Sequence, residues 1–176
     1  MIKIVAIGPE STGKSTLSEL LAAHYKTLWV PEYAREFLLK NGTDYSYNDL
    51  LTIARGQIEA EEKVTILATN ESKNLLLVDT DMYVMKVWCE FVFNQCHQWI
   101  LDCIVSRKYD LYLLCNVDLP WVKDVLREYP DLTTRQQLYY IYKDLMINQA
   151  VPWVDISGNY EERFQKAVKA IDDLLY

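Results

Sequence analysis

The sequence predicts an α/β fold, in which helices flank a parallel sheet of about five strands. Apolar, β-branched runs alternate along the chain with stretches of helical periodicity, a pattern typical of a parallel sheet covered on both faces. About half of the 176 residues are hydrophobic, enough to form a sizeable core. The stretch GPESTGKS, residues 8–15, follows the first of these runs and places a glycine-rich turn where the first helix should begin.

The expected strands are five short runs, at residues 2–7, 27–30, 74–79, 110–115 and 151–156. Helical periodicity follows residue 15 and recurs at residues 31–41, 47–70, 81–105 and 133–150. The last helix is expected from residue 159, where Asn159 and Glu162 can form an N-terminal cap. No linker or internal repeat separates these elements, so we expect a single domain over residues 1–176.

The stretch at residues 8–15 matches G-x-x-x-x-G-K-[ST], the pattern of a phosphate-binding P-loop. Lys14 is expected to reach the β- and γ-phosphates of ATP, and the Ser15 hydroxyl to bind Mg²⁺. A chance match in a glycine-rich turn is the alternative, but the strand before and the helix after it argue against this. The predicted cofactor-binding residues of the loop are Gly8, Glu10, Ser11, Thr12, Gly13, Lys14, Ser15 and Thr16.

Charge and hydropathy limit the partners. The chain has 18 basic and 25 acidic residues, a net charge of −7, so we expect no nucleic-acid or membrane partner, both of which require a broad basic surface. No apolar run approaches 18 residues and a strand begins almost at once, so we expect no membrane span or signal peptide and a cytoplasmic location. Cys89, Cys96 and Cys103 recur every seven residues, which predicts one buried helix face and not a metal site.

Missing motifs narrow the class of P-loop protein. A GTPase needs D-x-x-G and N-K-x-D after later strands, and the runs LLLVDTDM and LLCNVDLP lack the glycine and the lysine. A motor or AAA-type ATPase usually has a longer chain, with a further domain after the last strand. We therefore expect a small kinase that carries a phosphoryl group from ATP to a small molecule.

Several runs, in order along nearly the whole chain, resemble the ribosylnicotinamide kinase domain of the bacterial NadR family: GPESTGKST, PEYAREF, YNDLLTIARGQ, LLLVDTD, PWVKDVLRE and ISGNYEERFQKAVKAI. The resemblance implies ATP- and Mg²⁺-dependent phosphorylation of nicotinamide riboside to the mononucleotide. Alternatives are a kinase for another nucleoside or a small polyol, or a regulatory ATP-binding module with little turnover. The sequence does not indicate the oligomeric state.

Three acidic residues are candidates for the chemistry of phosphoryl transfer. Asp79 ends an expected strand and could bind Mg²⁺ with Ser15, although it could instead cap the following helix. Asp81, two residues on, has the same two interpretations. Glu32 could orient or deprotonate the acceptor hydroxyl, or could simply be an acid at a helix N-terminus. Arg35 could pair with Glu32, reach the acceptor or form a surface ion pair.

Two later segments complete the predicted site. Arg127 and Arg135 flank a loop-like stretch and are predicted catalytic residues of a lid that closes over the phosphates, although isolated arginines are often only solvated. Gly158 and Tyr160 are predicted to pack against adenine, although a plain turn and cap would look the same. Aromatic residues that could stack on a cationic nicotinamide ring, or could simply be core residues, are Tyr33, Tyr45, Tyr47 and Trp121.

Overall fold

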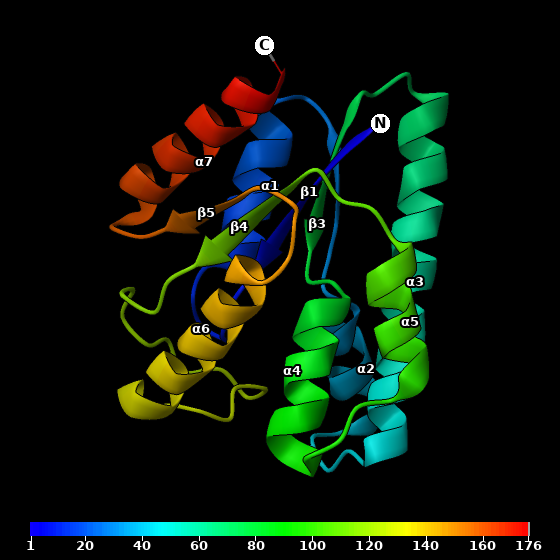
Figure 1. The fold of residues 1–176 in the computed structure, drawn as a ribbon, viewed down its shortest axis with the longest axis vertical. Helices are drawn as coiled ribbons and strands as arrows, with labels where there is room; N and C mark the ends of the chain where they lie inside the picture. The colour runs from blue at the N-terminus through cyan, green and yellow to red at the C-terminus, as the bar shows by residue number, and fades with distance from the viewer. Residues whose placement is uncertain (176) are drawn as a thin grey trace.

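The computed structural model describes residues 1–175 and contains a five-stranded parallel sheet. The strands, in the order β2-β3-β1-β4-β5, are β1 (Ile2–Ile7), β2 (Leu28–Val30), β3 (Leu75–Asp79), β4 (Leu111–Cys115) and β5 (Trp153–Ile156). The helices are α1 (Lys14–His24), α2 (Tyr33–Asn41), α3 (Tyr47–Asn70), α4 (Met82–Phe93), α5 (Gln98–Ser106), α6 (Leu132–Ile147) and α7 (Tyr160–Leu175). The predicted fold class is therefore confirmed (Figure 1).

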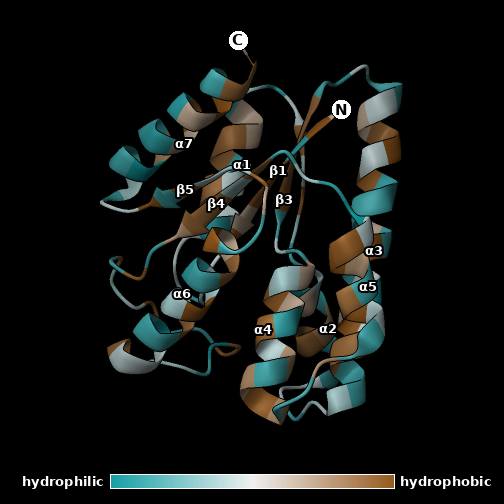
Figure 2. Ribbon diagram, viewed as in Figure 1, coloured by the Kyte–Doolittle hydropathy of each residue, from teal (hydrophilic) through white to brown (hydrophobic). Residues whose placement is uncertain are grey.

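Alternating side chains of the strands build two cores, one on each face of the sheet. On one face, Ile4 and Leu113 pack with residues of α1 and α7. On the other, Val5 and Leu114 pack with residues of α4 and α6. Because both faces are covered, β3 and β4 are buried along their whole length, and apolar brown segments run through the middle of the sheet (Figure 2).

A third apolar cluster joins α2, α3, α4 and α5 beside the sheet. Figure 1 shows these four helices gathered on one side of the molecule. Gly56 allows α2 to approach α3 closely, since a Cβ atom there would lie 2.0 Å from the ring of Tyr33. The buried amide of Gln57 adds polar ties, because it accepts the N–H of Tyr33 at 2.7 Å and donates to the carbonyl oxygen of Asp79 at 3.2 Å.

One expected element is wrong. The helix expected over residues 81–105 is two helices, α4 and α5, because α4 ends at Asn94, which has a left-handed backbone with φ of 54°. Cys96 lies between the two helices, so the three cysteines do not line one face of a single helix. All three are free thiols; Cys89 is buried, and Cys96 and Cys103 are partly buried. The cap at the last helix is confirmed, since Glu162 N–H donates to the Asn159 side chain at 3.0 Å.

The order of the strands fixes where a ligand can bind. β1 lies between β3 and β4, so the chain leaves the carboxyl end of β1 at the point where the sheet order reverses. In parallel α/β sheets this switch point opens a crevice outside the carboxyl ends of the strands. The P-loop follows β1 there, Glu32 follows β2, and Asp79 ends β3.

Candidate functional site

The P-loop is held against the end of β4 by close backbone packing. Gly8 has φ of 135°, and a Cβ atom there would lie 2.6 Å from the carbonyl oxygen of Cys115. Gly13, with φ of 79°, is the N-cap residue of α1. The Thr12 hydroxyl donates to the carbonyl oxygen of Pro9 at 2.7 Å. The two glycines therefore permit a turn that brings the N-terminus of α1 to the site, where its N–H groups favour an anion.

Lys14 lies inside this turn. Its ammonium group donates to the carbonyl oxygens of Gly8 at 3.0 Å and Pro9 at 2.9 Å, and the side chain is only 8% exposed. The carbonyl oxygens thus hold a buried positive charge at the centre of the loop. That position suits a point charge for a phosphate group and contributes little to the apolar core.

Asp79 is a fully buried carboxylate beside the loop. Within residues 1–175, no donor makes a hydrogen bond of ordinary geometry to either of its oxygens. Burial, and then the neighbouring carboxylate of Glu32, raise the pKa of Asp79, while Lys14 and the nearby Ser15 hydroxyl lower it in part. A buried carboxylate without partners is costly unless a cation or a donor joins it.

The donor set at this point fits Mg²⁺ better than a metal that needs a protein cage. The described residues contain no cluster of three or more His, Cys, Asp or Glu side chains that could hold a metal ion. Mg²⁺ commonly binds through one or two carboxylates together with substrate phosphates and water. Ser15 and the two unpartnered oxygens of Asp79 are suitable ligands for such an ion.

A cleft of about 320 Å³ joins the P-loop to a second region. Glu32 and Asp79 line it near the loop, and within the described chain the Glu32 side chain makes no cap hydrogen bond to α2 although Glu32 is its N-cap residue. Much of the remaining lining is apolar. Its aromatic residues, which we call the aromatic wall, are Trp29, Trp88, Phe91, Tyr129 and Tyr142.

The sequence interpretation missed this wall. Val84, Val87, Trp88 and Phe91 have the spacing of one helix face directly after Asp79, and all four line the cleft. That spacing could have indicated them. Tyr129 could not have been found in this way, because it lies in the irregular segment between β4 and α6.

The four aromatic residues proposed from sequence lie elsewhere, and the described lining of the cleft includes none of them. The Tyr33 ring packs on Gly56, and Tyr47 stacks on the ring of His97 with centroids 3.7 Å apart. Tyr45 lies outside the described lining but holds one residue of the aromatic wall, since its hydroxyl accepts the Trp88 indole N–H at 2.8 Å.

Asp81 is a buried helix cap. It accepts the N–H of Tyr83 at 2.9 Å and the hydroxyl proton of Tyr112 at 2.9 Å. Burial raises its pKa to about 7. Asp81 is not part of the described cleft lining, so of its two interpretations the geometry favours the cap over the metal ligand.

The two lid arginines both lie close to one indole ring. The guanidinium carbons of Arg127 and Arg135 are 5.8 Å and 5.2 Å from the Trp121 ring centroid. Arg127 lines the cleft and donates to the carbonyl oxygen of Val122. Arg135, on α6, is 4% exposed and outside the described lining, and Nε and Nη1 of this side chain have no partner within residues 1–175. Arg35 forms an ion pair of 3.0 Å with Asp124.

Gly158 and Tyr160 lie on the other side of the P-loop. Tyr160 lines a small pocket together with Gly13, Leu119 and Arg163. The sequence interpretation missed Arg163, which is 3% exposed and donates to the carbonyl oxygens of Thr12 at 2.9 Å and Gly158 at 2.7 Å. This arginine therefore ties the P-loop to the turn that precedes α7.

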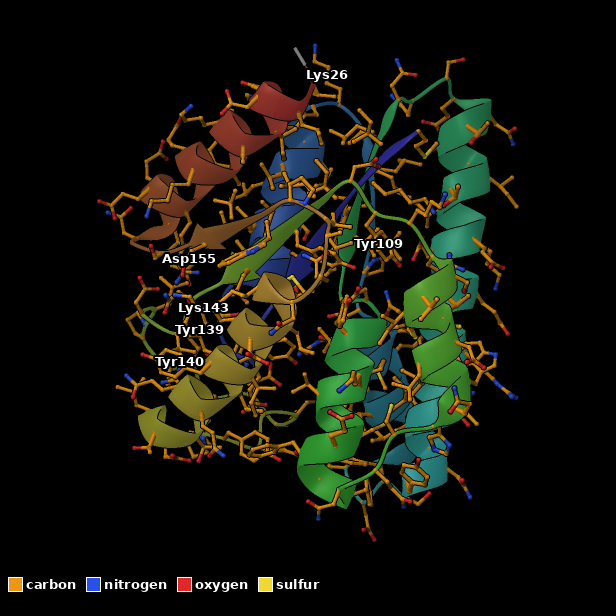
Figure 3. All side chains as sticks on the ribbon, viewed as in Figure 1. Lys26, Tyr109, Tyr139, Tyr140, Lys143 and Asp155 are labelled. Atoms are coloured by element: carbon orange, nitrogen blue, oxygen red, sulfur yellow. The ribbon has the colours of Figure 1, made fainter. Side chains whose placement is uncertain are left out.

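The ends of β4 and β5 are held by a polar cluster beneath this side of the site. Asp155 of β5 accepts a hydrogen bond from the Tyr139 hydroxyl of α6 and one of 3.3 Å from the Asn116 amide. Figure 3 shows Asp155 and Tyr139 on these neighbouring elements, with Lys143 one turn farther along α6. The cluster fixes Asn116, whose carbonyl oxygen accepts a hydrogen bond from Arg163 at 2.8 Å.

Solved structures share this fold. A NadR protein in complex with NR aligns over 98% of this chain and 51% of its own, with a TM-score of 0.77 and 19% identity. A NadR protein in complex with NAD and AMP-PNP aligns with a TM-score of 0.73 and 19% identity, over 98% of this chain and 49% of its own. Thymidylate kinase from Ehrlichia chaffeensis aligns over 97% of this chain and 98% of its own, with a TM-score of 0.66 and 14% identity. These likenesses establish that the chain shares the fold of these proteins.

Curated sequences give the same relation. The trifunctional NAD biosynthesis/regulator proteins NadR of Escherichia coli K12 and Salmonella typhimurium LT2 are each 26% identical to this chain over 180 residues. Each match covers 99% of this chain, which spans 43% of the length of these relatives. The resemblance to NadR seen in the sequence motifs is thereby confirmed.

A family model described as AAA domain matches residues 3–163. The match includes the P-loop, Asp79 and all of the sheet except Ile2. It corrects the expectation from chain length that set the AAA class aside, because this family takes in a P-loop domain as short as this one. The chain belongs to this AAA domain family of P-loop proteins.

Proposed function

We propose that the chain is an ATP-dependent kinase that phosphorylates the 5′-hydroxyl of nicotinamide riboside to give the mononucleotide, and that residues 1–176 act as a single kinase domain. One observation carries the proposal: a single cleft contains a P-loop, the Glu32–Asp79 pair and an aromatic wall. The similarity to NadR, one structure of which is in complex with NR, supports nicotinamide riboside as the acceptor.

The aromatic wall suits a flat cationic ring. Trp88 and Phe91 offer aromatic faces, and Glu32 and Glu128 add carboxylates to the same lining. A cation on an aromatic face gains about 0.5–2 kcal/mol, and a nearby carboxylate adds to this attraction. An uncharged nucleoside loses both contributions and keeps only the ribose and its hydroxyl groups.

Each conserved role in phosphoryl transfer has a candidate in the chain. Lys14 binds the β- and γ-phosphates, and Glu32 orients the acceptor hydroxyl and accepts its proton. Arg127 stabilises charge on the transferred group from the mouth of the cleft. Arg135 acts on the same segment through the Trp121 ring. Gly158 and Tyr160 bind the adenine side of ATP.

Ser15 and Asp79 are the residues that would hold Mg²⁺. When bound, the ion neutralises charge on the phosphates. A bound cation would favour the ionised form of Asp79, because it would offset the burial that raises the pKa of this carboxyl. The chain's own contribution is to hold the two ligands at the end of β3 and the start of α1, beside Lys14.

An ADP-release assay with a panel of acceptors tests the proposal. Nicotinamide riboside, uridine, cytidine and a small polyol are each supplied with ATP and Mg²⁺, and the product is identified by mass spectrometry. We expect turnover stimulated by nicotinamide riboside, with phosphate on the 5′-oxygen. Stimulation by another acceptor alone would indicate a different kinase, and ATP binding without stimulation would indicate a regulatory module.

No helix within residues 1–175 is both long and apolar enough to cross a membrane. The cytoplasmic location and the absence of a nucleic-acid partner stay predictions of the sequence.

A further inference from the structure

Glu10, the acidic residue of the P-loop, forms hydrogen bonds with the segment between β4 and α6. Its carboxylate accepts the backbone N–H of Glu128 at 3.0 Å and the backbone N–H of Tyr129. The neighbouring Ser11 hydroxyl accepts the N–H of Val122 at 3.2 Å. The P-loop, near the start of the chain, thus holds a segment more than 100 residues later. We call residues 120–130 the covering segment.

The covering segment contributes directly to the cleft. Its residues Leu126, Arg127, Glu128 and Tyr129 are all part of the lining. The Tyr129 ring packs edge-on against Phe91 of the aromatic wall, with centroids 5.5 Å apart. The position of this segment therefore decides the shape of the acceptor side as well as the place of Arg127.

The same segment is tied to the wall by a hydrogen-bonded chain. The Glu128 carboxylate accepts the Tyr45 hydroxyl proton at 2.9 Å, and the Tyr45 hydroxyl oxygen accepts the Trp88 indole N–H at 2.8 Å. Glu10 holds the backbone of Glu128, and the side chain of Glu128 leads to Trp88. A continuous set of contacts thus runs from the P-loop to Trp88 of the aromatic wall.

The other contacts of this segment are made by side chains, including Tyr129 on Phe91 and Trp121 beside Arg135. Residues 120–130 include no helix or strand of their own. The Arg35–Asp124 ion pair is exposed on the arginine side, and such pairs contribute little. Hydrogen bonds to a carboxylate are stronger than neutral ones, and Glu10 makes two of them from a partly buried position. These two N–H groups also offset part of the negative charge of Glu10, which limits the repulsion between Glu10 and a phosphate in the loop.

We infer that Glu10 is a positioning residue: it holds the covering segment on the cleft and so sets the places of Arg127 and Tyr129 relative to the P-loop. The kinetic part of this inference rests on the proposed function. Glu10 was expected from sequence to bind the nucleotide, and the geometry assigns its carboxylate to the protein instead. Without the Glu10 carboxylate, the covering segment moves more freely and packs less firmly on the aromatic wall. Water then gains access to the phosphates.

Amide hydrogen exchange of Glu128 and Tyr129, followed by NMR, tests the tie without any turnover. In Glu10→Ala we expect both amides to exchange at least about tenfold faster than in the wild type. Glu10→Gln keeps one carbonyl acceptor, so its exchange rates should fall between those of Glu10→Ala and the wild type. Glu19→Ala removes an exposed carboxylate of α1 and serves as the matched control, with unchanged exchange. Amides of β4 report whether the fold is intact. Unchanged exchange at 128 and 129 in Glu10→Ala would overturn the inference.

Kinetics test the positioning role. In Glu10→Ala we expect the ratio of acceptor-independent ATP hydrolysis to phosphoryl transfer to rise about tenfold or more. The KM for the acceptor should rise about tenfold, while the KM for ATP changes less than about threefold. A rise in ATP KM alone would mean that Glu10 binds nucleotide, and faster exchange with unchanged kinetics would mean a purely structural tie; either result overturns the positioning role. If the wild type transfers no phosphoryl group, the proposed function fails, and amide exchange still decides whether Glu10 holds the segment.

Discussion

At the scale of single residues, the site contains two kinds of buried polar side chain: those that we propose take part in the chemistry and those that stabilise the fold. Lys14 and Asp79 are both buried, yet Lys14 donates only to carbonyl oxygens of its own loop, and the Asp79 oxygens accept no hydrogen bond of ordinary geometry within residues 1–175. Asp81, two residues away, has both a helix N–H and a tyrosine hydroxyl as donors. Side chains of similar burial should therefore respond very differently to substitution.

Lys14→Ala should remove turnover and leave the fold intact. In the proposed function the ammonium group supplies charge to the phosphates, and its hydrogen bonds go to the carbonyl oxygens of Gly8 and Pro9 and not to other elements of the fold. We expect kcat below about a tenth of the wild-type value, a loss above about 1.4 kcal/mol, and a Tm within about 4 °C. Steady-state kinetics and thermal unfolding check this. A variant that kept more than about a tenth of kcat would contradict the P-loop assignment.

Asp79→Asn and Asp81→Asn form a matched pair. Asp79→Asn should weaken activation by Mg²⁺ strongly and leave the thermal stability nearly unchanged, because its carboxylate accepts no hydrogen bond of ordinary geometry within the described chain. Asp81→Asn should keep the Mg²⁺ dependence and cost about 1 kcal/mol of stability, the usual contribution of a helix cap. Mg²⁺ titrations and thermal melts separate the two. The reverse pattern would make Asp81 the metal ligand.

At the scale of helices and strands, polar and glycine contacts decide how closely the elements approach. Glu61, on α3, is 1% exposed and joins three elements: it accepts hydrogen bonds from Lys3 of β1 at 2.6 Å and Tyr109 at 2.8 Å, and pairs with Arg107 at 3.0 Å. Tyr109, labelled in Figure 3, lies just before β4. These contacts hold α3 against the sheet at the end away from the P-loop.

Glu61→Gln should destabilise the protein near neutral pH by about 2–4 kcal/mol, because it leaves two cations without their buried partner. Burial alone would raise the pKa of Glu61, but Lys3, Arg107 and Tyr109 hold it below the ordinary value. The stabilisation is thus present above the unfolded pKa and is lost as the pH falls through the lower folded pKa. Urea unfolding at pH 7 and below pH 4 should show the difference shrinking on acidification. An equal difference at both pH values would contradict this account.

Gly56→Ala tests the packing of α2 on α3. A Cβ atom would lie 2.0–2.5 Å from three atoms of the Tyr33 ring, so Tyr33 must move, and with it the helix start next to Glu32. We expect a loss of about 1–3 kcal/mol and a lower kcat/KM for the acceptor, with the KM for ATP little changed. Adding Tyr33→Ala relieves the overlap, so the double variant should lose less free energy of unfolding than the two single variants lose together. Strictly additive losses would show that the two residues do not compete for space.

Strands and most helices could be predicted from sequence because each depends on a local pattern. The strand at residues 2–7 matches β1, and the helix at residues 47–70 matches α3. The break at Asn94 was missed, since apolar residues continue on both sides of it and a left-handed asparagine leaves little trace in the periodicity.

At the scale of the whole molecule, the covering segment and the aromatic wall meet only through tertiary contacts. The P-loop and the carboxylates at the ends of β2 and β3 followed from motif and strand position. Tyr129 and Arg163 did not, because their roles depend on residues more than 100 positions away in the chain, Glu10 and Thr12. No local pattern indicates such contacts.

The central claim is that this cleft selects a cationic nucleoside. The most direct measurement is competition between nicotinamide riboside and uridine at fixed ATP. Uridine keeps the ribose and the 5′-hydroxyl and loses the attraction of the charged ring to the aromatic wall and the carboxylates. We predict that kcat/KM favours nicotinamide riboside by at least about tenfold, corresponding to about 1.4 kcal/mol of transition-state binding, with similar KM values for ATP. Equal efficiency, or a preference for uridine, would contradict the claim and leave only the P-loop kinase fold.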